Sequence, residues 1–244
     1  MPSKSLLLFL AAMLVVLPAS LPAQQTAKSS TAKSESSWQA AIKARREQLI
    51  QQNGPGTDAA LRSQLLAMHG KDEAVRGFYE GKRVSGMTPD MLAKMPATDA
   101  ELTSELKQIV DQKGWPTIWL VGIDASNAAM LVLTHSADHA WQAKLLPQLE
   151  KLADASQIDA SQLALVIDKE LIAEGKLQRY GTQFKFVNGE MAMYGVEDPG
   201  GLDHIRARAM LPPLDVYKQT LSQMYHLKAG NAIVSPTAPA QQEN

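Results

Sequence analysis

Hydrophobic residues recur every three or four positions through most of the chain, which is the period of an amphipathic helix. The first such stripe contains Trp38, Ile42 and Leu49, and Gly54-Pro55-Gly56 ends it. Later stripes of the same period cover residues 61–79, 102–110, 125–135, 141–152 and 163–171, and short helices are expected near 202–210 and 213–227. The pattern therefore predicts a mainly α fold.

Residues 125–135 are expected to form the central and most buried helix. Ala125, Ala128 and Ala129 are small, and small side chains let neighbouring helices approach closely. Gly122 divides this helix from the apolar segment before it.

Polar residues that can cap helix N-termini precede most of the stripes. Thr88-Pro89 combines a cap with a proline at the first helical position. Residues 98–101 read as a capping box, which predicts that a helix starts there, and Gly114 is expected to end that helix. The other predicted caps are Thr57, Asp124, Asp138 and Asp159.

The period changes near residue 183. The segments 184–187 and 191–194 flank Asn188-Gly189, which suits the two positive-φ positions of a tight hairpin turn. A lone hairpin is only marginally stable, so this one is expected to pack against the helices. The predicted fold is an irregular multi-helix bundle with one small β-hairpin near 183–194.

Residues 1–23 have the pattern of a secretory signal peptide. Lys4 precedes an apolar run over residues 6–17, and Ala23 is a suitable cleavage point. The run is shorter than a membrane span needs, so no stable membrane insertion is expected after cleavage; an uncleaved anchor is the alternative. No cysteine follows the run, which excludes a bacterial lipid anchor. The predicted destination is the periplasm or the cell exterior.

Composition divides the remainder into four parts. Residues 24–37 are polar and predict a disordered linker, and residues 229–244 predict a disordered tail. Between them, residues 38–113 are expected to form an N-terminal helical segment and residues 114–228 a C-terminal helical domain that includes the hairpin.

Overall composition excludes several classes of function. The 244 residues include 24 basic and 25 acidic side chains, a balance that does not favour nucleic acid as a partner. The absence of cysteine excludes disulfides, thiolate zinc sites and thiol nucleophiles. No glycine-rich phosphate loop and no Gly-x-Ser-x-Gly motif occurs, so no cofactor and no placed serine nucleophile are expected.

Several short motifs between residues 114 and 221 resemble a bacterial family known only as domain of unknown function 6624. The resemblance implies a shared fold and no particular activity. The motifs are Gly-Trp-Pro-Thr at 114–117, Ala-Ser-Asn-Ala-Ala at 125–129, His135 with Asp138, Glu-Gly-Lys at 174–176, Gln178, Tyr-Gly-Thr-Gln at 180–183, Glu-Asp-Pro at 197–199 and Leu-Pro-Pro-Leu at 211–214.

His135 is the candidate general base. It continues the buried stripe at the end of the central helix, and an unperturbed histidine titrates near neutral pH. Asp138 and Asp168 are the candidate carboxylates that would orient it. A core or capping histidine is the structural alternative.

A zinc site is an alternative hypothesis for the segment that contains His135. His135 and His139 are four residues apart, which on one helix would place both imidazoles on one face. Ser136 and Asp138 look like cap residues, however, so a break between the histidines is expected and no metal site is predicted.

Other polar side chains could complete a ligand site around His135. If the helices at 125–135 and 159–174 are neighbours, then Asn127, His135, Asp168 and Gln183 could converge. The alternative is a buried polar network that fixes helix register. The full set of candidate ligand-binding residues is Trp115, Asn127, Gln142, Gln178, Tyr180 and Gln183.

Two functions follow. The first is a non-catalytic binding or interaction module of the cell envelope, whose partner is a small ligand, a peptide or an envelope protein. The second is a hydrolase or lyase that uses His135 as general base. The enzyme requires a solvent-open cleft in which a carboxylate oxygen lies within hydrogen-bond reach of His135. A His135 that is sealed in the core with its nitrogens bonded only to backbone would exclude it.

Overall fold

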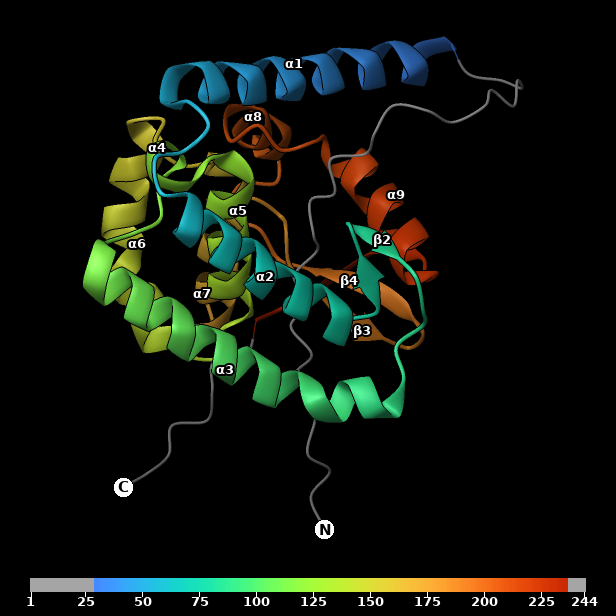
Figure 1. Cartoon of the computed structure of the whole chain (residues 1–244). Helices are drawn as coiled ribbons and strands as arrows, with labels where there is room; N and C mark the ends of the chain where they lie inside the picture. The colour runs from blue at the N-terminus through green and yellow to red at the C-terminus, as the bar shows by residue number, and fades with distance from the viewer. Residues whose placement is uncertain (1–28, 237–244) are drawn as a thin grey trace.

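The computed structural model describes residues 29–236, with side chains from residue 37 onward, and this part is mainly α-helical. The described chain forms nine helices and two small sheets (Figure 1). The helices are α1 Ser29–Asn53, α2 Ala59–Val75, α3 Pro89–Lys113, α4 Ile118–Val121, α5 Ile123–His135, α6 His139–Asp154, α7 Ala160–Ala173, α8 Leu202–Arg208 and α9 Leu214–Tyr225. The strands are β1 Phe78–Tyr79, β2 Lys82–Arg83, β3 Phe184–Val187, β4 Glu190–Tyr194 and β5 Ala229–Val234.

Helix α5 is the centre of the largest hydrophobic core, as its small residues predict. It contacts α2, α3, α4 and α7, and Ala125 and Ala129 are fully buried. Leu65 of α2 and Leu106 of α3 belong to the same cluster of buried side chains. The core is therefore continuous across residue 113.

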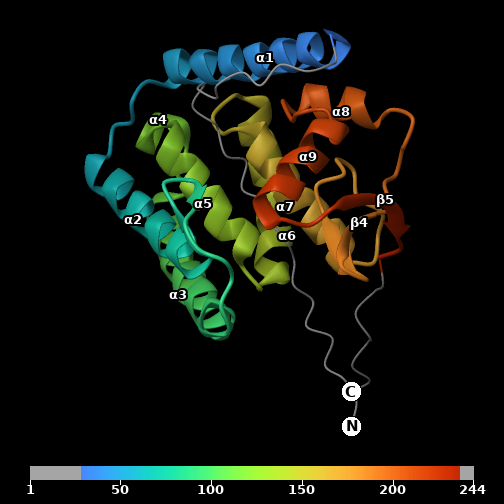
Figure 2. The ribbon, with the colours of Figure 1, turned by 90° about the vertical axis from the view of Figure 1, so that its right-hand side faces the viewer.

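A second core lies beneath the three-stranded sheet and involves α8 and α9. Figure 2 shows α2, α3 and α5 on one side of the molecule and the sheet with α8 and α9 on the other. Phe184, Met193 and Tyr217 are buried in this second cluster. The predicted hairpin is confirmed: Val187 pairs with Glu190, and both turn residues, Asn188 and Gly189, have positive φ.

The predicted disordered tail is wrong for its first six residues, which form β5. This strand pairs in parallel with β4 and completes the sheet order β3-β4-β5. The physical reason is that β3 covers only one edge of β4, and pairing the other edge satisfies more backbone groups. The remaining tail residues, 237–244, lie outside the described part.

The predicted linker is also wrong over residues 29–37, because α1 begins at Ser29. This stretch contains alanine, lysine, serine and glutamate without proline or glycine, and such a composition permits a helix that continues into the next stripe. Helix α1 lies across one end of the molecule in both views (Figures 1 and 2), where Leu49 is buried with Ile118 and Ile123. Residues 1–23, the predicted signal peptide, are outside the described part.

The end of α2 differs from the sequence prediction. The helix ends at Val75, and Tyr79 belongs to a two-stranded hairpin instead of continuing the stripe. Gly77 and Gly81 have positive φ, so the backbone turns twice within a few residues. These turns carry the chain away from α2 before a further helical turn can form.

The capping box predicted at residues 98–101 is wrong. Helix α3 starts at Pro89 with Thr88 as its cap, and it runs through Pro96 to Lys113 without a new start. Residues 98–101 therefore lie inside a helix that began earlier, and their backbone amides are already bonded within it, so no free amide remains for Thr98 to cap. Glu101, the other member of the predicted box, pairs with Lys71 on α2.

The remaining caps follow the sequence in part. Asp138 and Asp159 cap α6 and α7 as predicted, and Gly122 divides α4 from α5. Asp58, not Thr57, caps α2, and Gly122, not Asp124, occupies the N-cap of α5. Asp124 instead forms an ion pair with Arg46, because α1 lies over the start of α5.

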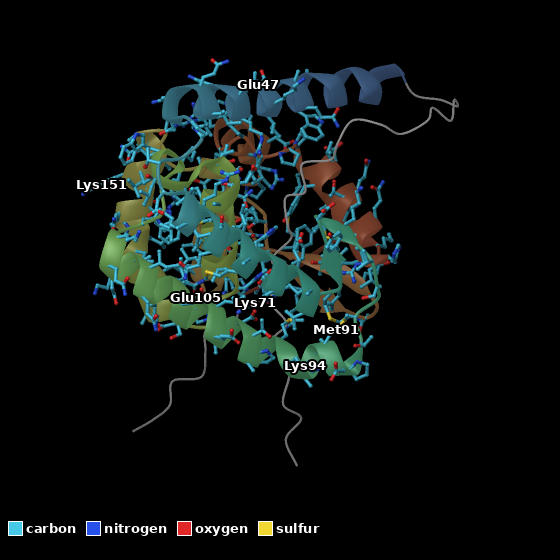
Figure 3. The ribbon with its side chains drawn as sticks, viewed as in Figure 1. Glu47, Lys71, Met91, Lys94, Glu105 and Lys151 are labelled. Atoms are coloured by element: carbon cyan, nitrogen blue, oxygen red, sulfur yellow. The ribbon has the colours of Figure 1, made fainter. Side chains whose placement is uncertain are left out.

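Charged side chains cover the outer faces of the helices. Glu47, Lys71 and Lys151 are exposed on α1, α2 and α6 (Figure 3). No described helix combines the length and apolar character that crossing a bilayer requires.

Candidate acid–base site

His135 ends α5 and is held by a carboxylate from a distant part of the chain. Its Nδ1 lies 2.7 Å from Oδ1 of Asp72 on α2. Asp72 is fully buried, and 6 % of the histidine side chain is exposed. The second ring nitrogen, Nε2, has no hydrogen-bond partner among the described residues. This arrangement orients the imidazole and leaves one nitrogen for chemistry.

Arg76 links Asp72 to a second carboxylate. Arg76 follows the last residue of α2 and lies one helical turn after Asp72. Its Nη1 donates to Asp72 Oδ1 at 2.8 Å, and its Nη2 donates to both oxygens of Asp99 on α3. Burial alone would raise the pKa of Asp72, but the neighbouring His135 and Arg76 lower it below its ordinary value. Asp72 is therefore an anion at neutral pH.

One buried oxygen of this cluster has no partner. Asp72 Oδ2 accepts no hydrogen bond in the described chain. Atoms of Asp72, Asp99 and His135 lie within 4.8 Å of one another, so they could surround a cation. Arg76 already bonds both carboxylates from between them, and this fixed cation supplies the positive charge that such a pair requires.

Lys169 approaches the end of α5 from α7. Its Nζ donates to the carbonyl oxygens of Thr134 and Ser136, at 2.6 and 2.5 Å, on either side of His135. Burial lowers the pKa of Lys169 to about 8, while Glu170 and Asp99 act in the opposite direction. The lysine holds the carbonyl end of the helix that presents the imidazole.

The two histidines considered for zinc lie on different helices. Helix α5 ends at His135 and α6 begins at His139, so the expected break is confirmed. Each has its own acid, since His139 Nδ1 lies 2.8 Å from the buried Glu170. They form two separate histidine–carboxylate pairs.

Asp138 and Asp168 do not take the place of Asp72. Asp138 caps α6 through the amide of Trp141 and pairs with Lys107. Asp168 accepts hydrogen bonds from the amides of Arg179, Tyr180 and Thr182, and from the Thr182 hydroxyl. Burial raises the pKa of Asp168, and these hydrogen bonds oppose the increase. The carboxylate that contacts His135 is Asp72 of α2, which is not one of the two predicted acids.

Most of the predicted ligand-binding residues are used inside the fold. Gln178 joins the hairpin strands through the carbonyls of Gln183 and Tyr194, and it accepts from the Gln183 amide. Gln183 also bonds Thr182, which connects it to Asp168. Gln178, Gln183 and Asp168 therefore belong to one hydrogen-bond network, and this network positions the loop before β3.

The other four candidates are spread over the core. Gln142 donates to the carbonyl of Leu133 and has one buried oxygen without a partner. Trp115 is buried in the main core, and Tyr180 is partly buried and packs against that core. Asn127 is partly buried on α5, and its side chain makes no hydrogen bond within the described chain. The expected convergence of Asn127, Asp168 and Gln183 on His135 is not seen in the hydrogen bonds.

The residues missed by the sequence analysis carried only a faint local signal. Asp72 and Arg76 have the i,i+4 spacing of a helical ion pair, which is common on exposed surfaces. In the sequence, Lys169 lies next to the apolar stripe of α7, where charged residues commonly border the buried face of a helix. Their burial depends on how α2, α3, α5 and α7 pack.

The family model described as a family of unknown function, DUF6624, matches residues 59–230. The chain belongs to this family. The match starts with α2 and ends in β5, so it extends the resemblance found at 114–221 in both directions. Asp72, Arg76, Asp99, His135 and Lys169 all lie inside it. No curated protein and no solved structure matches the chain.

Proposed function

We propose that the chain is an acid–base enzyme, a hydrolase or lyase in which His135 acts as general base. The observation that carries the proposal is the 2.7 Å contact between its Nδ1 and the buried carboxylate of Asp72. A neutral imidazole that donates Nδ1–H to a carboxylate presents Nε2 as the acceptor of a substrate proton. Asp72 then stabilises the imidazolium formed.

The surrounding charges suit this role. His135 and Arg76 together lower the pKa of Asp72 and keep it ionised, and Lys169 bonds the carbonyls beside His135. The imidazole therefore has a fixed carboxylate partner and a fixed backbone. Two groups with shifted pKa values, Asp72 and Lys169, contact His135 or the backbone beside it, and such clustering is typical of functional sites.

A panel of chromogenic esters, glycosides and peptide amides tests the proposal. We expect one class to be turned over, and His135→Gln to lower its rate at least about 100-fold. His204→Gln is the matched control, because His204 is exposed on α8. Activity that survives in folded His135→Gln would overturn the proposal.

Chemical modification provides a readout that needs no substrate. Diethyl pyrocarbonate reacts with an unprotonated, reachable imidazole nitrogen, and mass spectrometry identifies the site. We expect His135 to be modified in the folded protein near pH 7. A His135 that becomes reactive only after denaturation would indicate that no substrate reaches it.

A binding or interaction module of the cell envelope is the second candidate. The small exposed fraction of the His135 side chain, 6 %, favours it, since a catalytic base needs access. This candidate predicts that a small ligand, a peptide or an envelope protein raises the melting temperature while the panel stays inactive. Both candidates share the proposal of export to the periplasm or beyond, which rests on the pattern of residues 1–23.

A further inference from the structure

A pocket of about 590 Å³ lies where the two halves of the chain meet, away from the contacts that His135 makes. One wall comes from the end of β2, the following loop and the start of α3; the other comes from β3 and the end of α9. Its apolar lining consists of Val84, Met87, Leu92, Phe186 and Leu227. The volume is within the range, roughly 300–1,000 Å³, of small-molecule sites.

The apolar side chains of this pocket are unusually open to solvent. Val84 is 65 % exposed, and Met87, Leu92 and Phe186 are also exposed. Side chains of this kind that gather around one concavity mark a binding surface more often than scattered apolar residues do.

The lining of the pocket includes a positive charge without a carboxylate partner in the described chain. Arg83 donates from Nε to the carbonyl of Met224 and from Nη1 to that of Ser85, and it forms no ion pair within the described chain. Its guanidinium lies 4.7 Å from the ring centre of Phe78 and 5.5 Å from that of Tyr225. The rings and carbonyls hold the cation in place, and its Nη2 makes no bond in the described residues.

No aspartate or glutamate lines the pocket in the described chain. Tyr225, beside Arg83, is a neutral donor, because burial raises the pKa of its hydroxyl to about 12 against the opposing effect of Arg83. The lining therefore includes a fixed cation and the neutral hydroxyl-bearing side chain of Tyr225, and no described side chain on it carries a negative charge.

We infer that this pocket binds a monoanionic amphiphile, namely a long-chain carboxylate whose head pairs with Arg83 and whose alkyl chain lies against Val84, Leu92 and Phe186. A carboxylate matches the planar guanidinium and its single charge. The alkyl chain removes the exposed apolar surface from water. This inference is independent of the acid–base proposal, since the two involve different residues.

Titration with a fluorescent long-chain fatty acid, kept below its critical micelle concentration, tests the inference. The full chain should bind the carboxylate saturably, with one molecule per chain. A probe with the same chain and an alcohol head should bind about tenfold more weakly, because it cannot form the charge-assisted hydrogen bond. A trimethylammonium probe should bind more weakly still.

Two pairs of variants locate the site. Arg83→Gln should lower the affinity for the carboxylate to that for the alcohol, whereas Arg208→Gln, the same charge change on exposed α8, should have no effect. Leu92→Trp should fill the pocket and abolish binding of both probes. Leu66→Trp is its control, because Leu66 is similarly exposed on α2 and does not line the pocket.

Circular dichroism shows whether each variant is folded. If Arg83→Gln fails to fold, the comparison of head groups on the unaltered chain and the Leu92→Trp variant still decide the matter. Equal affinity for all three probes, full binding by folded Leu92→Trp, or no saturable binding would each overturn the inference. His135→Gln should bind the carboxylate normally, which separates a failure here from a failure of the acid–base proposal.

Discussion

His135 Nδ1 and Asp72 Oδ1 are 2.7 Å apart although the two residues are separated by 63 positions in the chain. The contact joins the end of α5 to α2 and places a charged group inside the main core. Arg76, which pairs with Asp72, also pairs with Asp99 on α3. One polar cluster thus connects three helices that otherwise pack through apolar side chains.

Removal of the imidazole should destabilise the fold. His135→Ala leaves Asp72 buried with only Arg76 as a partner, and loss of one member of a buried pair costs about 3 kcal/mol. Urea denaturation measures the change in the free energy of unfolding. His204→Ala should cost little, and an equal loss in both variants would show that the pair contributes nothing to stability.

Stability should fall in acid because of Asp72. The pKa of this carboxyl is below 3.8 in the folded protein, since His135 and Arg76 outweigh the effect of burial. The contribution of Asp72 is therefore complete above the unfolded pKa and is lost as the pH falls through the folded one. Asp72→Asn should flatten the stability profile below about pH 4, and Asp203→Asn on exposed α8 should leave its shape intact.

Lys169 should make stability rise with pH in the alkaline range. Its pKa is about 8 in the folded chain against an ordinary 10.5, so between these values the unfolded state binds more protons. The free energy of unfolding should increase between pH 8 and 10 by on the order of 2 kcal/mol from this group. Lys169→Met should remove the increase and Lys144→Met, at an exposed position, should not. An unchanged slope would contradict the prediction.

Asp168 should be indispensable to the loop before β3. Its oxygens accept from three backbone amides and one hydroxyl, and Asp168→Asn would point an NH₂ group at donors. We expect a loss of about 3 kcal/mol, because buried donors lose their partner. Thermal unfolding of Asp168→Asn and of exposed Asp215→Asn provides the comparison; similar melting temperatures would rule out this role.

Two glycines with open surroundings should respond in opposite directions to alanine. Gly189 has φ +82 in the hairpin turn with no atom near its added Cβ, so Gly189→Ala should cost about 1 kcal/mol through backbone strain alone. Gly70 is inside α2 with equally open surroundings, and Gly70→Ala should stabilise the helix by about 0.5–1 kcal/mol. Chemical denaturation of both variants checks the signs.

Local rules predicted much of the fold. The Asn188-Gly189 turn, the Thr88-Pro89 start and the Asp138 and Asp159 caps depend on residues within four positions of each other, and all are present. The small residues of α5 correctly indicated the central helix. The capping box at residues 98–101 failed because α3 had already begun at Pro89, so the backbone amides there were bonded within the helix and needed no cap.

The sequence alone determined the helical class, the hairpin, the membership of residues 59–230 in one family and the choice of His135 as the candidate general base. Only the tertiary structure decided that Asp72 orients this histidine, that Asp168 supports a loop, and that Arg83 faces an apolar pocket. The physical reason is distance along the chain. Periodicity and caps report interactions between near neighbours, whereas a buried charge is stabilised by whichever group the packing of other helices brings to it.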